Sequence, residues 1–247
     1  MSGWVYGRNA VLELLRSGTR QVHRLVIVPG RGDQRVREIT SLARRAGVSI
    51  RRGPIGEIAA LAGSGANHQG VAAEVEDKSY RDPGAILAST SGTPLYVVLD
   101  GVEDPRNLGA VIRSAAGAGA DALFVPARRA AGLSPGTLRT ASGAVEHLPV
   151  ARIGNVVTFL KQLKKKGIWI VGLDASGNTA WTDFDLRQPL ALVLGGEGRG
   201  LRRLARETCD VLLSIPLSKG IESLNLSVAA GVLLFETVRQ RRSGKDF

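Results

Sequence analysis

The 247-residue sequence contains little cysteine, few aromatic residues and no long apolar run. Its single cysteine, Cys209, excludes an internal disulfide and a multi-cysteine zinc site, and we predict no bound metal. No apolar run reaches the about 18–20 residues that a membrane-spanning helix needs. Residues 1–8 also lack the basic cap and apolar core of a secretory signal. We therefore expect a cytoplasmic protein without a membrane partner.

Acidic residues are outnumbered by basic ones: 22 Asp and Glu stand against 33 Lys and Arg, which gives a net charge of +11. The imbalance is strongest in residues 1–53, where eleven arginines stand against three acidic residues, a local balance of +8. Such a surface attracts phosphate backbones without reading their sequence, and the planar guanidinium fits phosphate well. The charge favours a nucleic-acid partner; a genome that favours arginine codons would give the same composition without this function.

The first part of the chain, residues 1–76, alternates helical and strand-like patterns. This alternation predicts a small α/β unit with a basic face. Residues 77–93 are rich in Asp, Ser, Pro, Gly and Thr, and we predict that they form a linker. The elements expected in the first part are helices at 5–16 (with Asn9 as N-cap), 34–46 and 55–62, and strands at 22–28, 48–51 and 70–75.

The second part, residues 94–247, begins with the apolar run 95–100, of the kind that is buried in parallel sheets. Strands and helices then alternate, which predicts a parallel sheet with helices on both faces. Ligands of such sheets bind beyond the carboxyl ends of the strands, so we expect a site there. The expected strands are 95–100, 122–126, 148–152, 168–173, 190–195 and 211–215, and the expected helices are 108–118, 155–166, 200–206 and 224–241.

Two polar residues follow the first strand of this sheet. Asn107 falls at the expected mouth of a helix, and Arg113 lies six residues later, nearly two turns along it. Alone, Asn107 is most simply an N-cap and Arg113 a solvated helix residue. Together, at the carboxyl end of a strand, they could present an amide and a guanidinium to one substrate.

A glycine-rich segment, Gly195–Gly200, follows a later strand and reads Gly-Gly-Glu-Gly-Arg-Gly. Glycine lets the backbone approach a ligand closely, but the segment is neither GxGxxG nor a phosphate-binding P-loop. The central Glu197 would repel a pyrophosphate and suits a ligand with positive charge, such as the sulfonium of S-adenosylmethionine. A plain tight turn is the alternative interpretation.

The last segment of interest runs from Leu213 to Glu236. A strand ends at Pro216, a loop follows, and a helix rich in small residues begins near Asn225. Ser223 or Asn225 would cap that helix in any case. These residues alone leave open whether the loop also binds a ligand.

In this order, the three segments resemble the three motifs of the SpoU (TrmH-like) RNA methyltransferases of the SPOUT superfamily. The matching stretches are 107–113, 195–200 and 215–229, and the resemblance covers about residues 95–240. The first part, which contains Tyr6-Gly-Arg-Asn-Ala-Val, looks like the ribosomal-protein-like (L30e-like) substrate-binding domain of 23S rRNA guanosine 2′-O-methyltransferases (RlmB type).

The resemblance implies a fold, a cofactor and an activity. The second part would be a knotted α/β domain with a C-terminal trefoil knot, an exception to the rule that chains are un-knotted, and it would work as a homodimer. The reaction would be S-adenosylmethionine-dependent methylation of a ribose 2′-hydroxyl in RNA rather than DNA, with a guanosine of 23S rRNA as the implied target. The implied catalytic residues are Asn107, Arg113, Glu197, Ser223 and Asn225, and the implied cofactor-binding residues are Leu194, Gly195, Gly196, Glu197, Gly198, Ile215, Pro216, Leu217, Ser223, Leu224 and Asn225.

The chemistry restricts the role of Arg113. A ribose 2′-hydroxyl reacts poorly until it loses its proton or is held in line with the methyl donor. No histidine lies in the three motif segments, and an arginine keeps its proton at any cellular pH. We therefore expect Arg113 to orient the 2′-hydroxyl and the neighbouring phosphate, while the phosphate or water relays the proton. Asn107 would hold Arg113 or the ribose, and Glu197 would anchor this network as an acceptor.

Three other functions are alternatives to this one. Within the family, the substrate could instead be tRNA, or the enzyme could be a drug-resistance rRNA methylase. A catalytically inactive RNA-binding protein would have lost motif residues, but all of them are present. A Rossmann dehydrogenase would need GxGxxG after the first strand, where this chain has Asp100-Gly-Val-Glu-Asp-Pro.

Overall fold

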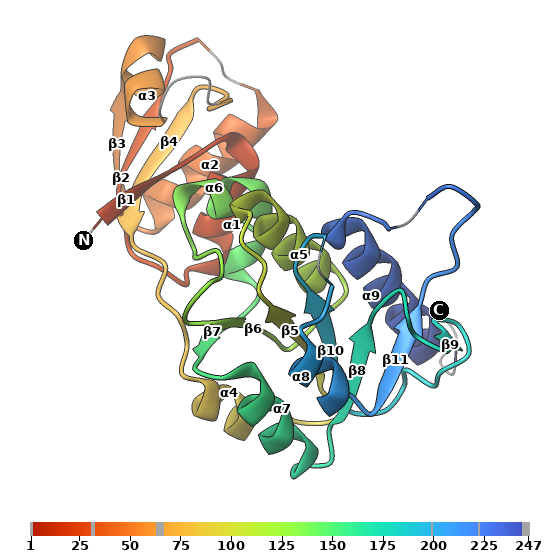
Figure 1. Cartoon of the computed structure of the whole chain (residues 1–247). Helices are drawn as coiled ribbons and strands as arrows, with labels where there is room; N and C mark the ends of the chain where they lie inside the picture. Colours follow the sequence, from red (N-terminus) through yellow and green to blue (C-terminus); the bar gives the residue numbers. More distant parts are fainter. Residues whose placement is uncertain (1, 31–32, 63–66, 199, 222, 244–247) are drawn as a thin grey trace. The chain divides into compact units, whose positions relative to one another are not determined.

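The computed structural model describes residues 2–30, 33–62, 67–198, 200–221 and 223–243 (Figure 1). The chain divides into two compact units. Unit 1 consists of Met1–Ser79 and Leu138–His147, and unit 2 consists of Tyr80–Thr137 and Leu148–Phe247.

Unit 1 is built on a four-stranded sheet in the order β1-β4-β2-β3. Strand β4 is antiparallel to β1 and β2, whereas the edge strand β3 is parallel to β2. The bounds are Ser2–Tyr6 (β1), Arg8–Ser17 (α1), Val22–Ile27 (β2), Gln34–Arg45 (α2), Ser49–Arg52 (β3), Ile55–Ala62 (α3) and Val71–Glu76 (β4).

The alternation of side chains along β2 and β4 gives unit 1 an apolar core on each face of its sheet. On one face, Leu25 and Ala73 pack with residues of α1 and α2, among them Leu14 and Ile39. On the other face, Val26 and Ala72 pack against Ile58 of α3 and against side chains of β1. The predicted small α/β unit is therefore present.

Strand β1 is the main difference from the sequence prediction in this unit. We expected a helix from residue 5 capped by Asn9, but Val5 and Tyr6 belong to a strand that pairs with β4. The helix begins at Arg8 after Gly7, with no side-chain cap. Residues 2–6 form a strand because they pair with β4 and because the side chains of Trp4 and Tyr6 pack on the core beneath α3.

A short insertion from the second part of the sequence completes unit 1. Residues Leu138–His147 belong to unit 1, although the chain on both sides of them belongs to unit 2. They contain the end of α6 (Pro135–Ala141) and a 3₁₀ turn at Ala144–Glu146. Gly143 between them has a φ of +88°, and a Cβ there would lie 2.8 Å from the Cβ of Glu13, so only glycine fits this approach to α1.

A buried ion cluster holds the insertion. The Glu146 side chain is 1% exposed and accepts hydrogen bonds from Arg20 Nη2 (2.5 Å) and Thr19 Oγ1 (2.6 Å). Lys78 Nζ lies 3.1 Å from the same carboxylate. Burial alone would raise the pKa of Glu146, but the hydrogen bonds from Arg20 and Thr19 and the charge of Lys78 outweigh it and hold that pKa below its ordinary value.

Unit 2 contains a seven-stranded sheet in the order β7-β6-β5-β10-β8-β11-β9, in which every pairing is parallel. The strands are β5 (Leu95–Asp100), β6 (Ala122–Pro126), β7 (Val150–Ile153), β8 (Trp169–Leu173), β9 (Thr179–Ala180), β10 (Leu190–Gly195) and β11 (Val211–Ser214). The helices are α4 (Pro83–Ser89), α5 (Pro105–Gly117), α7 (Val156–Lys164), α8 (Arg203–Thr208) and α9 (Leu226–Arg242), besides the start of α6.

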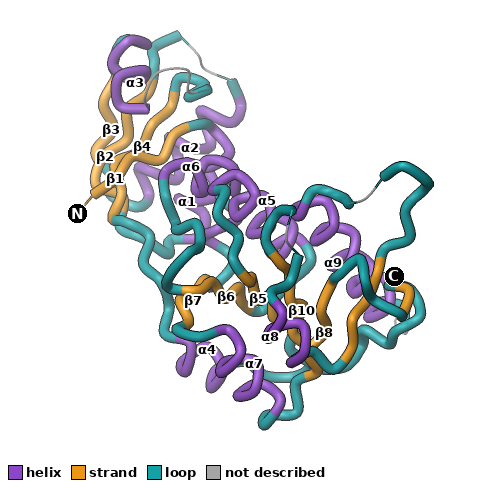
Figure 2. Tube along the Cα trace, in the orientation of Figure 1, coloured by secondary structure: helices purple, strands orange, loops and turns teal. Residues whose placement is uncertain are grey.

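Helices cover both faces of this sheet, as the alternation of strands and helices predicted (Figure 2). Side chains of α4, α7 and α8 pack with Val98, Phe124 and Val193 in one core. Helix α9 packs on α5 and reaches β10. Every residue of β5, β6 and β10 is buried, which explains why these strands are continuous apolar runs. The trefoil knot stays a prediction.

The segment that we predicted as a linker, residues 77–93, contains helix α4. Asp82 caps this helix by accepting a hydrogen bond from the Ala85 backbone nitrogen (2.7 Å), and Pro83 occupies its first turn. Ile86 is buried in the core of unit 2. The turn-forming composition of the segment therefore marks a helix start rather than a structureless connection.

The Glu146 cluster predicts a strong and pH-dependent contribution to stability. The Glu146→Gln variant leaves the buried Arg20 without a carboxylate, and we expect a loss of about 3 kcal/mol in the free energy of unfolding at neutral pH. Because the folded state lowers the pKa of Glu146, its contribution is complete above the ordinary value of 4.5 and disappears as the pH falls through the lowered pKa.

Denaturant unfolding of the wild-type and variant proteins across pH measures this contribution. As a control, Glu38→Gln removes an exposed pair with Arg16, and we expect it to cost less than about 1 kcal/mol. Equal losses for the two variants, or a difference between wild type and Glu146→Gln that stays constant down to acidic pH, would contradict the assignment.

Candidate functional site

The three motif segments leave neighbouring strands at one edge of the unit 2 sheet. Strand β10 lies between β5 and β8, and β11 pairs with β8. The last residues of β5 and β10, Asp100 and Gly195, are direct partners in the register. Because all these strands are parallel, the chain emerges from each of them at the same carboxyl edge, where ligands of such sheets bind.

Asn107 and Asn225 bring the first and last motifs into contact. The Nδ2 atom of Asn225 donates a hydrogen bond to Oδ1 of Asn107 at 3.1 Å, across 118 residues of sequence. The interpretation of Asn107 as an N-cap is wrong, because Asp104 caps α5 by accepting from the Arg106 backbone nitrogen at 2.7 Å. Asn107 lies in the first turn, is buried, and has an amide free to contact the last motif.

Asn225 also caps α9, as one of the two candidates that we expected. Its Oδ1 accepts hydrogen bonds from the Ser227 backbone nitrogen (2.9 Å) and from Ser227 Oγ (2.6 Å). The two ends of one amide therefore fix the start of α9 and join it to α5. Ser223, the other candidate cap, is exposed in the loop before the helix.

The glycine-rich turn is shaped by backbone packed against backbone. A Cβ on Gly195 would lie 2.0 Å from the carbonyl carbon of Gly200, and a Cβ on Gly196 would lie 2.6 Å from the carbonyl oxygen of Gly101. The Gly200 nitrogen donates to the Gly196 oxygen at 3.1 Å and closes the turn. The first two glycines are therefore required by the fold itself, and Glu197 is presented on the exposed tip of the turn.

Asp100, which was not among the predicted site residues, fixes the end of the same turn. It is 2% exposed, and its Oδ2 accepts a hydrogen bond from the Arg202 backbone nitrogen at 2.9 Å. The guanidinium of Arg202 lies 3.7 Å from the other carboxylate oxygen. The available signal was a carboxylate directly at the end of an apolar strand, where burial requires a partner.

The loop after β11 offers backbone groups to a ligand. Ser214 is held by a hydrogen bond from the Trp181 nitrogen to its oxygen (3.0 Å). The backbones of Ile215 and Leu217 form no hydrogen bond to another described residue, although both residues are partly buried. Their backbone groups are therefore available to a bound molecule. Leu224 is also half-buried, and Pro216 is exposed.

Arg113 and Glu197 do not reach the asparagine pair within one chain. Six residues of helix correspond to a rotation of about 600°, so Arg113 lies on another side of α5 than Asn107. It is exposed and forms no hydrogen bond or ion pair with the described residues. The charge of Glu197 acts on Arg106, whose pKa is raised first by Asp104 and to a smaller degree by Glu197. Of the two roles expected for Asn107, to hold Arg113 or the ribose, the first is not present within a single chain.

The described residues contain no group of three potential metal ligands, and no described helix is long and apolar enough to cross a membrane. The polar groups at the carboxyl edge that could contact a ligand are instead amides, backbone groups and one exposed carboxylate. This set fits an organic cation with polar substituents, which is the chemistry of S-adenosylmethionine.

Two family models match the chain. The model of the SpoU rRNA Methylase family matches residues 94–235, and the model of RNA 2′-O ribose methyltransferase substrate binding matches residues 4–81. The first match spans more than half of the chain and includes the insertion at 138–147 that is part of unit 1.

Known proteins are similar over almost the whole chain. The 23S rRNA (guanosine-2′-O-)-methyltransferase RlmB of Xylella fastidiosa is 42% identical over 244 residues, which cover 96% of this chain and 96% of the relative. The putative TrmH family tRNA/rRNA methyltransferase YacO of Bacillus subtilis is 37% identical over 241 residues with the same coverage. The crystal structure of the SpoU methyltransferase AviRb from Streptomyces viridochromogenes with its cofactor AdoMet is 29% identical, has a TM-score of 0.80 and covers 98% of this chain and 92% of that chain.

The matches agree with the geometry, since the three motif segments that the fold gathers at one sheet edge all lie within the matched region. The chain is an enzyme that transfers a methyl group from S-adenosyl-L-methionine to a ribose 2′-hydroxyl of RNA, and it belongs to the SpoU rRNA methylase family.

Proposed function

We propose that the substrate is a guanosine of the large-subunit (23S) rRNA and that the enzyme acts in the cytoplasm. The observation that carries the proposal is the 42% identity to a 23S rRNA guanosine methyltransferase over 96% of both chains. The arginine-rich composition of residues 1–53, within the region matched by the substrate-binding model, agrees with a structured and highly charged RNA target. A tRNA substrate is the second candidate, because the relative from Bacillus subtilis is described as a tRNA/rRNA methyltransferase.

The cofactor site would be formed by the loops that follow β10 and β11. The backbones of Gly195, Ile215, Leu217 and Leu224 would bind its polar groups, and the carboxylate of Glu197 would oppose its positive charge. Leu194, Gly196, Gly198, Pro216 and Ser223 would complete the walls of this site. The bound cofactor supplies an electrophilic methyl group, so the remaining task of the protein is to position the 2′-hydroxyl.

Arg113 would bind the substrate rather than act as a base. Its guanidinium keeps its proton, and its planar fork can donate to the 2′-hydroxyl oxygen and to the adjoining phosphate at once. The proton of the hydroxyl would pass to that phosphate or to water as the bond to the methyl carbon forms. The Asn107–Asn225 pair would hold the loop before α9 in the conformation that presents the cofactor.

We also propose that the enzyme is a homodimer in which α5 and α9 form the interface. Val228 and Phe235 of α9 are each 52% exposed, which is unusual for large apolar side chains on a closely packed helix. A Cβ on the exposed Gly117 of α5 would lie 3.7 Å from the ring of Phe235, so the apolar surface continues from one helix to the other. A second copy on this surface would cover it and would bring its Arg113 to the site of the first.

The substrate is tested by methyl transfer from labelled S-adenosylmethionine to unmodified large-subunit rRNA and, separately, to bulk tRNA, followed by mapping of the ribose methyl groups. We expect label on one guanosine ribose of the rRNA. Label on tRNA would keep the reaction and overturn the substrate.

The asparagine contact predicts a loss of activity with a modest loss of stability. In Asn225→Ser the serine still caps α9 but is too short to donate to the buried Oδ1 of Asn107. We expect the free energy of unfolding to fall by about 1–2 kcal/mol and methyl transfer to fall at least about tenfold. The matched control is Asn155→Ser, the same change at the cap of α7, which lacks such a contact. Unchanged methyl transfer in Asn225→Ser, or an equal loss in both variants, would count against the role of the pair.

A further inference from the structure

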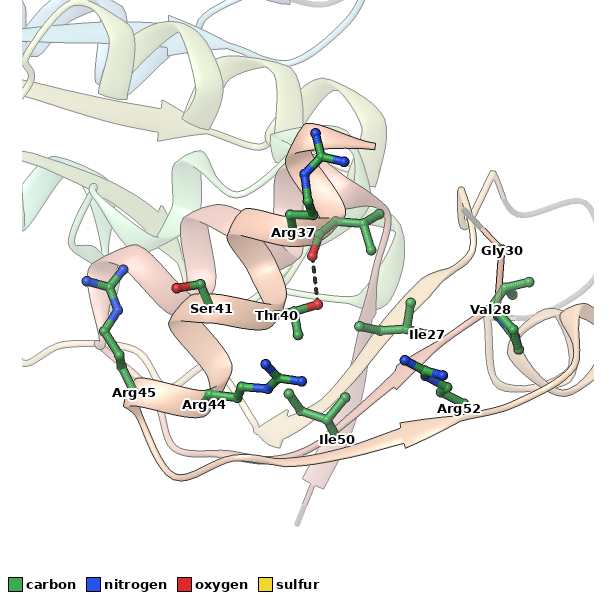
Figure 3. A pocket seen from close by; sticks show the side chains of 12 residues that line it. Ile27, Val28, Gly30, Arg37, Thr40, Ser41, Arg44, Arg45, Ile50 and Arg52 are labelled. Atoms are coloured by element: carbon green, nitrogen blue, oxygen red, sulfur yellow. Dashed lines mark hydrogen bonds between the residues drawn. The ribbon is translucent and has the colours of Figure 1, made fainter. Parts of the chain in front are cut away.

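A hollow of about 600 Å³ lies in unit 1 between α2 and the edge of its sheet (Figure 3). Its walls come from the end of β2 with the turn after it, from one face of α2, and from β3. The volume is within the range of about 300–1,000 Å³ that is usual for small-molecule sites. None of the implied catalytic or cofactor-binding residues lines this hollow.

The floor of the hollow is apolar. Ile27 and Val36 are buried there, and Val28 and Ile50 are partly exposed to the open space. The hydroxyl of Thr40 donates to the Val36 carbonyl oxygen at 2.7 Å, so the helix itself uses this polar group. The floor therefore offers flat apolar contact and little hydrogen bonding of its own.

The rim of the hollow is basic. Four arginines line it, and no acidic residue does: Arg37, Arg44, Arg45 and Arg52. Figure 3 shows Arg44 of α2 and Arg52 of β3 pointing toward each other above Ile50, whereas Arg45 points away. No ion pair joins Arg44 or Arg52 to a carboxylate among the residues that the structure describes.

Arginines elsewhere in unit 1 contrast with this pair. Arg8, Arg16, Arg24 and Arg51 each form an ion pair with an Asp or Glu side chain. Arg51 is the direct neighbour of Arg52, but the alternation of a strand turns it to the opposite face, where it meets Glu57. Arg44 and Arg52, which have no ion-pair partner among the described residues, therefore concentrate positive charge over the apolar floor.

We propose that this hollow binds one unpaired nucleotide of the RNA substrate, with the base on the apolar floor and the adjoining phosphates on Arg44 and Arg52. Guanidinium groups bind phosphate through paired hydrogen bonds and also stack on bases. A base inside an A-form duplex is stacked and paired, so it cannot enter a concave site, whereas a base in a loop or bulge can. The inference rests on the proposed RNA function and adds a single-stranded feature that unit 1 recognises.

The test compares two double variants of the full chain that remove the same charge. Arg44→Gln/Arg52→Gln alters the hollow, and Arg16→Gln/Arg51→Gln alters two paired arginines outside it. Binding of a short single-stranded oligouridylate and of an RNA duplex of the same length is measured over a range of salt concentrations. Thermal unfolding of both variants confirms that they fold.

We expect the hollow variant to bind the oligouridylate at least tenfold more weakly than wild type, and the control variant to bind it within twofold. Loss of two phosphate contacts should reduce the slope of log K against log salt by about 1.4, at about 0.7 per contact in single strands. Ser41→Glu, an exposed position in the wall, should weaken binding in the same way by placing a carboxylate there, and Ser41→Lys should not.

Equal losses in the two double variants would reduce the effect to overall charge and overturn the inference. If the hollow variant lost as much affinity for the duplex as for the oligouridylate, the hollow would not be specific for an unpaired nucleotide, and the inference would be wrong. Methyl transfer by wild type to rRNA, measured in parallel, separates this inference from the proposed function. If wild type methylates rRNA while the hollow variants bind normally, only the inference fails; if rRNA is not methylated but the hollow variants lose oligonucleotide binding, only the proposed substrate fails.

Discussion

The site depends on one constraint, which is the contact of backbone with backbone at the carboxyl end of β10. Gly195 and Gly196 leave no space for a Cβ because the Gly200 and Gly101 backbones lie against them. This packing holds the second motif against the end of β5, the strand that precedes the first motif, although 95 residues of sequence separate the paired positions Asp100 and Gly195. Any larger side chain there would push the turn with Glu197 away from the end of β5.

The other half of the site is fixed by the amide pair rather than by a backbone contact. Asn225 starts α9 and donates to Asn107 on α5, so the loop after β11 is held at both ends. Arg113, which we propose contacts the substrate, lies on another side of α5 and forms no hydrogen bond with this pair. This separation around α5 supports the proposal that the site is shared between two chains.

Much of the fold could be predicted because the relevant signals are local. The apolar runs of β5 and β10 are buried on both faces and have the composition that full burial requires. Strand β1 was not predicted, because it is stabilised by pairing with β4, which is distant in sequence. Helix α4 was not predicted, because its cap, Asp82, lies in a segment whose composition is typical of turns. No local pattern predicts the insertion at 138–147, because its two key residues contact distant parts of the chain. Gly143 packs against α1, and Glu146 pairs with Arg20.

The same distinction applies to the site. The motifs identify its residues but do not predict how these residues contact each other. Asn107 can accept from Asn225 because Asp104, not Asn107, caps α5.

The insertion also affects experiments on the two units. Removing residues 1–76 would leave Glu146 without Arg20 and Thr19, so truncation does not separate substrate binding from catalysis cleanly.

The proposed shared site requires Arg113 of one chain to act with Asn107 and Asn225 of another. The most direct measurement is the methyl-transfer rate of mixed subunits, made by refolding Arg113→Ala together with Asn107→Ala. In a mixed dimer with shared sites, one site carries both defects and the other carries none, so activity should exceed that of either variant alone. If Arg113 acted within its own chain, every site would carry one defect, and an absence of recovered activity in mixed dimers would contradict the account.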